Sequence, residues 1–225
     1  MKKILVVAAH PDDEILGCGG TIARLAGEGC EAYSLILGEG ITSRDDKRVR
    51  GKRSEDIKQL KGQISRADKI VGIKKVFAYD LPDNRFDTVA LLDIIKIIES
   101  VMNTIKPDII FTHYKRDLNI DHQLTYQAAI TAARPSAEES VREIYSFEIP
   151  SSTEWGFPLS FSPDVFFDIE NTLKLKLKAM AEYKTELKDF PHPRSLKGIT
   201  MNAGQWGMKI GLRYAEAFEC VRVIK

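Results

Sequence analysis

A histidine followed by a run of acids lies near the N-terminus. His10 and Pro11 precede three consecutive carboxylates, Asp12, Asp13 and Glu14. Three like charges beside a buried strand end repel one another strongly unless a cation lies among them. Imidazole nitrogen and carboxylate oxygen together suit zinc, and a catalytic zinc site needs about three protein ligands with one position left open. The segment therefore predicts part of a metal centre, and a further ligand must come from elsewhere in the chain.

A second strand end can supply the missing ligand. The apolar run at 109–112 is followed ten residues later by His122, which opens a predicted helix. If the two strands are parallel neighbours, His10, Asp13 and His122 form a site with two imidazoles and one carboxylate. Asp12 is then free to act as general base on a water at the metal. We expect zinc, although such a ligand set also accepts another divalent metal.

Each of these residues has a structural explanation when it is considered alone. A single histidine at a strand end usually packs with its ring hydrogen-bonded. A single aspartate in that position more often caps a helix. The joint pattern favours the metal, because three of the chain's four histidines flank acids at predicted strand ends.

Apolar runs and amphipathic stretches predict the elements that bring these residues together. Residues 4–9 are continuous, apolar and β-branched, which is typical of a strand buried on both faces. We expect a glycine-rich turn at 17–20 and then a helix at 21–26. The other predicted strands are 31–37, 75–79, 109–112, 144–148 and 217–223, the other helices 54–71, 87–105, 122–134 and 170–188, and the main loops 43–53 and 150–163. This order predicts an α/β fold with an open, mostly parallel sheet and helices on both faces, which binds ligands beyond the carboxyl ends of its strands.

Composition limits the class of protein. The chain has 225 residues, 44% of them apolar and 29% charged, which suits a single domain spanning residues 1–225. The formal net charge of +1 gives no electrostatic drive toward nucleic acid or anionic membranes. We recognise no signal peptide and no apolar stretch long enough to cross a bilayer, and we expect the three cysteines to be free thiols. The expected location is the cytoplasm, and the expected partner is a small molecule.

The N-terminal motif resembles that of a known enzyme family. Ala9-His10-Pro11-Asp12-Asp13-Glu14, followed by Gly17-Cys18-Gly19-Gly20-Thr21, is similar to the opening motif of the LmbE-like (PIG-L) N-acetylglucosaminyl deacetylases, and Asp121-His122 is similar to their later metal-ligand motif. The resemblance extends over most of the chain. It implies a Rossmann-like fold, zinc bound by His10, Asp13 and His122, and Asp12 as the general base. It also implies an N-acetylated sugar or sugar conjugate as substrate, and it is compatible with a homo-oligomer.

Two positions depart from the family pattern. The family's later motif commonly reads His-Pro-Asp-His, and its first histidine helps to polarise the substrate carbonyl or to protonate the leaving amine; Asn119 occupies that position here. An asparagine can donate a hydrogen bond to an oxyanion but cannot deliver a proton at neutral pH. The proton must then come from Asp12 or from another group such as His192. The second departure is Leu60-Lys61-Gly62-Gln63, where many members carry a substrate-contacting Arg-x-x-Glu, so the identity of the sugar is left open.

Further candidate residues lie on two loops and at a strand end. His192 lies between two prolines that fix its loop, so it is a candidate catalytic residue as well as a surface residue. Arg194 can bind an anionic group such as a phosphate, although a solvated arginine is the common alternative. Trp155 can stack on a sugar ring or pack beneath its own loop. His113 is either a partner of the metal ligands or a packed strand-end residue.

Three functions compete on this pattern. The first is a metal-dependent hydrolase that removes the acetyl group from an N-acetylated amino sugar, with Asp12 activating water. The second is a non-catalytic or differently specific metal-binding relative, which the departure at Asn119 suggests. The third is a nucleotide-binding Rossmann protein, but Ile22 breaks the Gly-x-Gly-x-x-Gly spacing and carboxylates lie where pyrophosphate needs positive charge. The sequence favours the first function.

Overall fold

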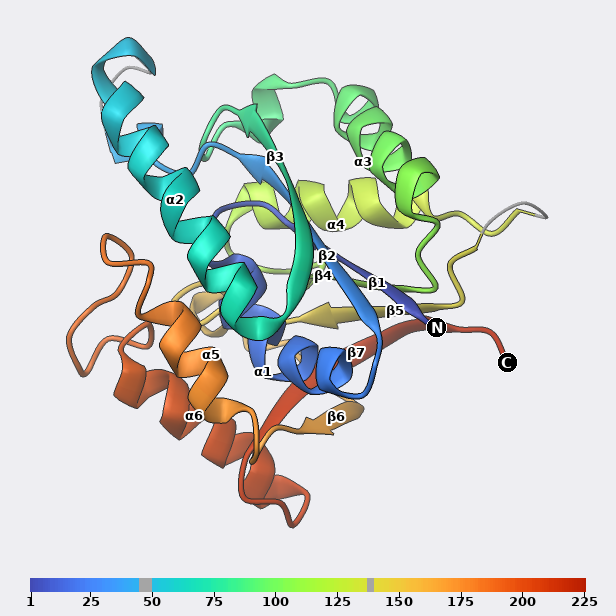
Figure 1. Ribbon diagram of the computed structural model, residues 1–225, viewed down its shortest axis with the longest axis vertical. Helices are drawn as coiled ribbons and strands as arrows, with labels where there is room; N and C mark the ends of the chain where they lie inside the picture. Colours follow the sequence, from blue (N-terminus) through green and yellow to red (C-terminus); the bar gives the residue numbers. More distant parts are fainter. Residues whose placement is uncertain (45–49, 137–139) are drawn as a thin grey trace.

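The first strand, β1 (Lys3–Ala8), lies in the interior of the sheet. The computed structural model describes residues 1–44, 50–136 and 140–225, and within these the strands form one sheet in the order β3-β2-β1-β4-β5-β7-β6 (Figure 1). Its other strands are β2 (Glu31–Gly38), β3 (Ile73–Leu81), β4 (Ile109–His113), β5 (Glu143–Phe147), β6 (Val165–Asp168) and β7 (Ala215–Val223). The first five strands pair in parallel, and β7 runs antiparallel to both β5 and β6. The prediction of an open, mostly parallel sheet is confirmed.

The direction of winding changes beside β1. The chain builds outward from β1 to β2 and β3, and then returns to place β4 on the other side of β1. At such a switch point the loops that follow the two strands diverge and leave a crevice for a ligand. His10 comes after β1 and His113 ends β4. The topology therefore brings the two chemistry-bearing groups of the sequence together.

Helices cover both faces of the sheet, as predicted (Figure 1). Alternate residues of β1 enter opposite cores, because successive side chains of a strand point to opposite faces: Ile4 and Val6 join one core, and Leu5 and Val7 join the other. One face carries α1 (Asp13–Gly27), α2 (Ser54–Val71), α5 (Leu173–Met180) and α6 (Leu196–Lys209), and the other carries α3 (Leu91–Ile105) and α4 (Ile120–Ala132). Short 3-10 turns lie at Thr42–Arg44, Arg50–Arg53, Phe86–Thr88 and Thr153–Trp155. In the part of the chain that the structure describes, no helix is long and apolar enough to cross a membrane.

The predicted glycine-rich turn at 17–20 is wrong, because these glycines lie inside α1. The helix begins at Asp13 and is kinked at Cys18, whose φ is −146°. A methyl group at Gly17 would overlap the ring of Phe147, and one at Gly20 would lie 3.0 Å from Ile169. The glycines therefore allow α1 to pack closely on β5 and on the connection between β6 and α5.

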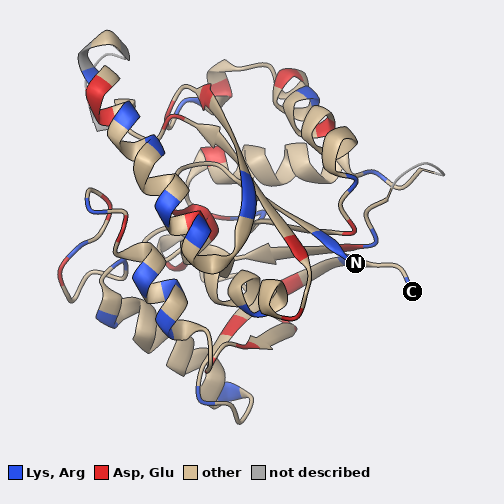
Figure 2. Ribbon diagram, viewed as in Figure 1, with Lys and Arg blue, Asp and Glu red and all other residues tan. Residues whose placement is uncertain are grey.

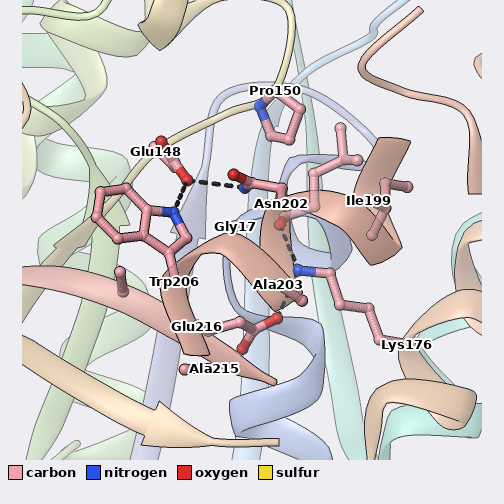
Figure 3. A pocket seen from close by; sticks show the side chains of 12 residues that line it. Gly17, Glu148, Pro150, Lys176, Ile199, Asn202, Ala203, Trp206, Ala215 and Glu216 are labelled. Carbon is pink, nitrogen blue, oxygen red and sulfur yellow. Dashed lines mark hydrogen bonds and ion pairs between the residues drawn. The ribbon is translucent and has the colours of Figure 1, made fainter. Parts of the chain in front are cut away.

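A buried ion pair joins the two halves of the kinked helix (Figure 3). Lys176 Nζ donates to the carbonyl oxygen of Leu16 at 2.7 Å and lies 2.5 Å from Glu216 Oε1. The Glu216 carboxylate accepts from the backbone N–H groups of Gly20 at 3.0 Å and Thr21 at 2.6 Å. A break in a helix frees backbone donors on one side and acceptors on the other. Lys176 of α5 binds the freed carbonyl oxygen, and Glu216 of β7 binds the freed N–H groups. Together they fix the direction of the first turn of α1.

Three other predictions of local structure need correction. The helix predicted at 170–188 ends at Met180, and the chain then turns so that the hydroxyl of buried Tyr183 reaches Glu14. Asp87 does not cap α3, which begins at Leu91. Asp87 lies instead in a short 3-10 turn before that helix, and the backbone N–H of Phe86 in this turn donates to Asp121 Oδ1 of α4. Both α6 and the four-residue strand β6 were missing from the prediction. The charged segment at 43–53 lies partly outside the described residues.

Candidate metal centre

One carboxylate lies among three imidazoles at the switch point. Asp13 Oδ2 is 3.5 Å from His10 Nδ1, 3.4 Å from His122 Nε2 and 3.5 Å from His113 Nε2. Asp13, His113 and His122 are buried, and His10 is nearly so. Among the described residues, Asp13 Oδ1 and His122 Nε2 have no hydrogen-bond partner. Unpaired buried polar atoms are costly, and a cation bound among them would satisfy both.

The predicted ligands form a set that could hold a metal. Donor atoms of His10, Asp13 and His122 all lie within 4.8 Å of one another. A second set, His10 with Asp83 and Asp121, meets the same criterion. We favour the first set, because among the described residues it holds two buried atoms without a hydrogen-bond partner, Asp13 Oδ1 and His122 Nε2, whereas Asp83 and Asp121 accept the backbone N–H groups of Ser43 and Phe86. Asp83 and Asp121 then orient the His10 ring through its Nε2 and are not themselves metal ligands.

Each proposed ligand imidazole contacts a carboxylate through its other nitrogen. Asp121 Oδ2 lies 2.9 Å from His10 Nε2, and Asp117 Oδ1 lies 3.0 Å from His122 Nδ1. Asp117 in turn accepts hydrogen bonds from the hydroxyls of Ser152 and Thr153. Such contacts fix the ring orientation of metal-binding histidines. They leave His10 Nδ1 and His122 Nε2 directed toward Asp13.

The carboxylates hold two of the imidazoles in a form that carries a proton. Burial lowers the pKa of His122, but Asp13 and Asp117 outweigh it and raise the pKa to about 8. Burial likewise opposes protonation of His10, and Asp121 with Asp13 raises its pKa well above the ordinary range. Burial and His122 hold the pKa of His113 well below its usual value. Two protonated imidazoles beside one carboxylate supply the positive charge that a divalent cation would replace, since metal binding releases protons from its ligands.

Asp12, the predicted base, lies beside this cluster with a strained backbone. Its φ of 93° is in the left-handed region that non-glycine residues rarely adopt. The side chain is buried, and Asp12 Oδ2 lies 3.1 Å from Arg194 Nη1. Burial raises the pKa of Asp12 to about 8; Arg194 opposes the rise, while the charges of Asp13 and Glu186 add to it. A carboxyl group that titrates near neutrality suits proton transfer at neutral pH.

Residues from two distant loops meet around Arg194, which contacts Asp12. Arg194 is largely buried and also donates to Ser151 Oγ at 2.8 Å, so it is not the solvated arginine of the common alternative. The backbone N–H of Arg194 donates to His192 Nδ1 at 3.1 Å, which leaves Nε2 to carry the proton of the neutral ring. Burial, Arg194 and Lys188 lower the pKa of His192. Trp155 meets the His192 ring edge to face at 5.9 Å and remains 47% exposed, so a role in substrate binding stays a prediction.

Asn119 has a structural task at the start of α4. Its Oδ1 accepts from the backbone N–H of Asp121 at 2.8 Å, which makes it the N-cap of the helix that carries His122. Its Nδ2 donates to Asn84 Oδ1 at 2.7 Å. One amide hydrogen is therefore already engaged, and the predicted role as an oxyanion donor rests on the other.

Several residues of the site escaped the sequence reasoning. Asp83 and Asp117 lie on loops with no periodic pattern, and only their position near predicted strand ends could have pointed to them. Asp68 of α2, which forms a buried pair with Glu14, was also missed; burial raises the pKa of Asp68 to about 7 and that of Glu14 well above its ordinary range. Nothing local in the sequence connects Tyr183 with Glu14, because 169 positions separate them.

Comparisons with known proteins identify relatives of the chain. Residues 5–133 match the family PIG-L, described as GlcNAc-PI de-N-acetylase. The Escherichia coli (strain K12) protein named "Uncharacterized deacetylase YaiS" is 31% identical over 82% of this chain and 91% of its own length. The diacetylchitobiose deacetylase of Thermococcus kodakarensis is 26% identical over 98% of this chain and 84% of its own length.

Solved structures share the fold. The N,N'-diacetylchitobiose deacetylase of Pyrococcus horikoshii aligns with a TM-score of 0.77 and 20% identity over 98% of this chain and 84% of its own. The 4-carboxy-2-hydroxymuconate hydratase of Pseudomonas putida aligns with a TM-score of 0.78 and 23% identity over 100% of this chain and 99% of its own. The same fold thus also occurs in a hydratase, so the fold alone does not decide the reaction. The family match and the 31% identical relative do decide the family: this chain is an enzyme of the PIG-L (LmbE-like) deacetylases.

Proposed function

We propose that this chain is a zinc-dependent hydrolase that removes the acetyl group from an N-acetylated amino sugar conjugate. The observation that carries the proposal is the buried cluster of His10, Asp13 and His122, whose donor atoms lie within 4.8 Å of one another. Among the described residues, Asp13 Oδ1 and His122 Nε2 in this cluster have no hydrogen-bond partner. Two imidazoles and one carboxylate are a known donor set of catalytic zinc. The deacetylase family and the chitobiose deacetylase relative support a sugar acetamide as substrate.

A divalent ion held by these three residues would polarise the amide carbonyl, lower the pKa of a bound water and favour the ionised form of Asp12. Asp12 accepts a proton from the water as the water oxygen attacks the acyl carbon. Arg194 holds one oxygen of the Asp12 carboxylate and leaves the other for this proton. Near neutral pH, His192 presents its Nε2–H as a donor to the oxyanion.

The leaving amine receives its proton from Asp12 in this proposal. Asn119 occupies the position of the family's histidine and cannot release a proton at neutral pH. Asp12 has gained a proton from water by this stage and can pass it to the nitrogen as the carbon–nitrogen bond breaks. The products are acetate and a free amine, and Asp12 returns to its ionised form.

The test combines metal analysis with a panel of N-acetylated sugars and sugar conjugates. We expect wild-type protein with bound zinc to release acetate and an equal amount of amine from at least one conjugate. Asp12→Asn should keep its zinc and lose at least about 100-fold in kcat, the scale of a positioned general base. Full zinc occupancy without acetate release from any acetylated sugar would contradict the proposal and favour a non-catalytic or differently specific relative.

A further inference from the structure

The backbone of the proposed base is held in a conformation that it would not adopt unaided. Asp12 has a φ of 93° and a ψ of −23°, and the helix α1 begins immediately after it. A left-handed backbone is unfavourable for a non-glycine residue, so the surrounding contacts must impose it. The carbonyl oxygen of Asp12 accepts from the backbone N–H of Ile15 at 3.1 Å and of Leu16 at 2.8 Å.

The other side of the Asp12 peptide is held by a side chain. The backbone N–H of Asp12 donates to Glu14 Oε2 at 3.1 Å, and Glu14 is completely buried. Glu14 can hold this N–H in place only if its own carboxyl group is fixed. The Asp68 carboxyl group of α2 interacts with that of Glu14, and the hydroxyl of Ser34 in β2 donates to Asp68 Oδ2 at 2.6 Å.

Tyr183 supplies a second contact to Glu14, from the opposite end of the chain. Its hydroxyl donates to Glu14 Oε1 at 2.5 Å, and its ring is completely buried. The residue lies in the turns that follow α5, where the predicted helix is interrupted. A phenylalanine would fill the same space, so apolar packing alone does not explain the hydroxyl.

We propose that Tyr183 is a positioning residue for Asp12. The Tyr183 hydroxyl fixes the Glu14 carboxyl group, and Glu14 in turn binds the backbone N–H of Asp12. These contacts keep the Asp12 backbone left-handed and so place its side chain beside the proposed metal ligands. The inference deepens the proposed function and rests on it, because the role of Asp12 as base is part of that proposal. It assigns Tyr183 an effect on catalysis without any contact with substrate.

The test compares Tyr183→Phe with Tyr145→Phe in the full-length zinc-loaded protein. The Tyr145 hydroxyl donates to Glu143 at 2.8 Å in β5, away from the metal cluster, so its removal is a matched loss of one hydroxyl. We expect Tyr183→Phe to lower kcat about tenfold, the effect of one hydrogen bond, with KM and zinc content unchanged. Tyr145→Phe should leave kcat unchanged. In a Glu14→Gln background, Tyr183→Phe should have less than its single effect, because both act on one contact.

A second measurement does not depend on activity. Hydrogen exchange of the Asp12 backbone amide should become about tenfold faster in Tyr183→Phe and stay unchanged in Tyr145→Phe. Normal exchange together with normal kcat in Tyr183→Phe would overturn the positioning role while leaving the deacetylase proposal intact. If wild-type protein deacetylates nothing, the proposed function fails, and the exchange experiment alone decides whether Tyr183 holds Asp12.

Discussion

Individual carboxylates appear in two roles at this site. Asp13 faces the imidazoles as a proposed ligand, whereas Asp117 and Asp121 contact the far nitrogens of His122 and His10. The second role matters as much as the first, because an imidazole that rotated away from Asp13 could not bind a metal. It also explains why the acids around His122 are buried although they are not proposed ligands.

Replacing Asp117 should therefore weaken metal binding. Asp117→Asn removes the charge that fixes His122 Nδ1, and we expect zinc affinity to fall about 10- to 100-fold. Competition against a chromophoric chelator measures the change. Asp108→Asn is the matched control. Asp108 accepts a hydrogen bond from the backbone N–H of Lys3 at 2.7 Å, at the start of β1 and therefore at the opposite end of that strand from the site. Equal zinc affinity in both variants would show that Asp117 does not support metal binding.

At the scale of elements, the first helix is the part that presents the chemistry. Its opening turn carries Asp13 and Glu14, and its kink is held by the Lys176–Glu216 pair. Its glycines permit contact with β5 at a distance that no side chain would allow. The direction of this turn therefore depends on packing as well as on hydrogen bonds.

Two glycines of α1 allow this dependence to be measured. Gly17→Ala forces a methyl group against Phe147, and we expect it to lower the free energy of unfolding by about 1–3 kcal/mol. A methyl group at Gly27 would meet no atom of the described residues within 4 Å, so Gly27→Ala should be neutral or stabilising by up to about 1 kcal/mol, because alanine favours the helix. Urea denaturation of the two variants provides the comparison. Equal stability would mean that the close approach of α1 to β5 does not constrain the fold.

At the scale of the whole molecule, acidic and basic residues are spread over many of the described elements (Figure 2). Figure 2 shows residues of both signs along α2 and basic residues on α5. Three of the acids are internal: Asp12 precedes α1, Glu14 lies in α1 and Asp68 lies in α2, and all three are buried. Burying three acids gives the stability of the whole fold a pH dependence.

Asp68 provides a test of this dependence. Burial raises its pKa to about 7 from the ordinary 3.8, so the folded state binds a proton that the unfolded state has released. Its stabilising contribution is complete below about pH 4 and is lost as the pH rises through about 7. We expect metal-free wild-type protein to have a lower urea midpoint at pH 8 than at pH 5, and Asp68→Asn to reduce the difference. An unchanged difference, matching that of the exposed-site control Asp93→Asn, would contradict this account.

The sequence by itself determined the family and the layers of this protein, and it predicted the residues of the metal site. His10, Asp12 and Asp13 are adjacent in the chain, so their proximity needs no tertiary structure, and the end of a buried strand fixes where they lie. The continuous apolar run before them predicted a strand with helices on both sides, and alternate residues of β1 do enter two cores. The deacetylase family also follows from this local motif, and the comparisons confirm it.

Only the tertiary structure decided which groups surround that motif. Lys176 and Glu216 meet at the kink of α1, Tyr183 reaches Glu14, and Arg194 reaches Asp12 across separations of 40, 169 and 182 positions. No periodicity records such contacts, because each depends on how loops and helix ends from the C-terminal third settle on the sheet. The glycines of α1 were misread for the same reason: a glycine needed for close packing and one needed for a turn are identical in sequence, and only the neighbour that a side chain would strike tells them apart.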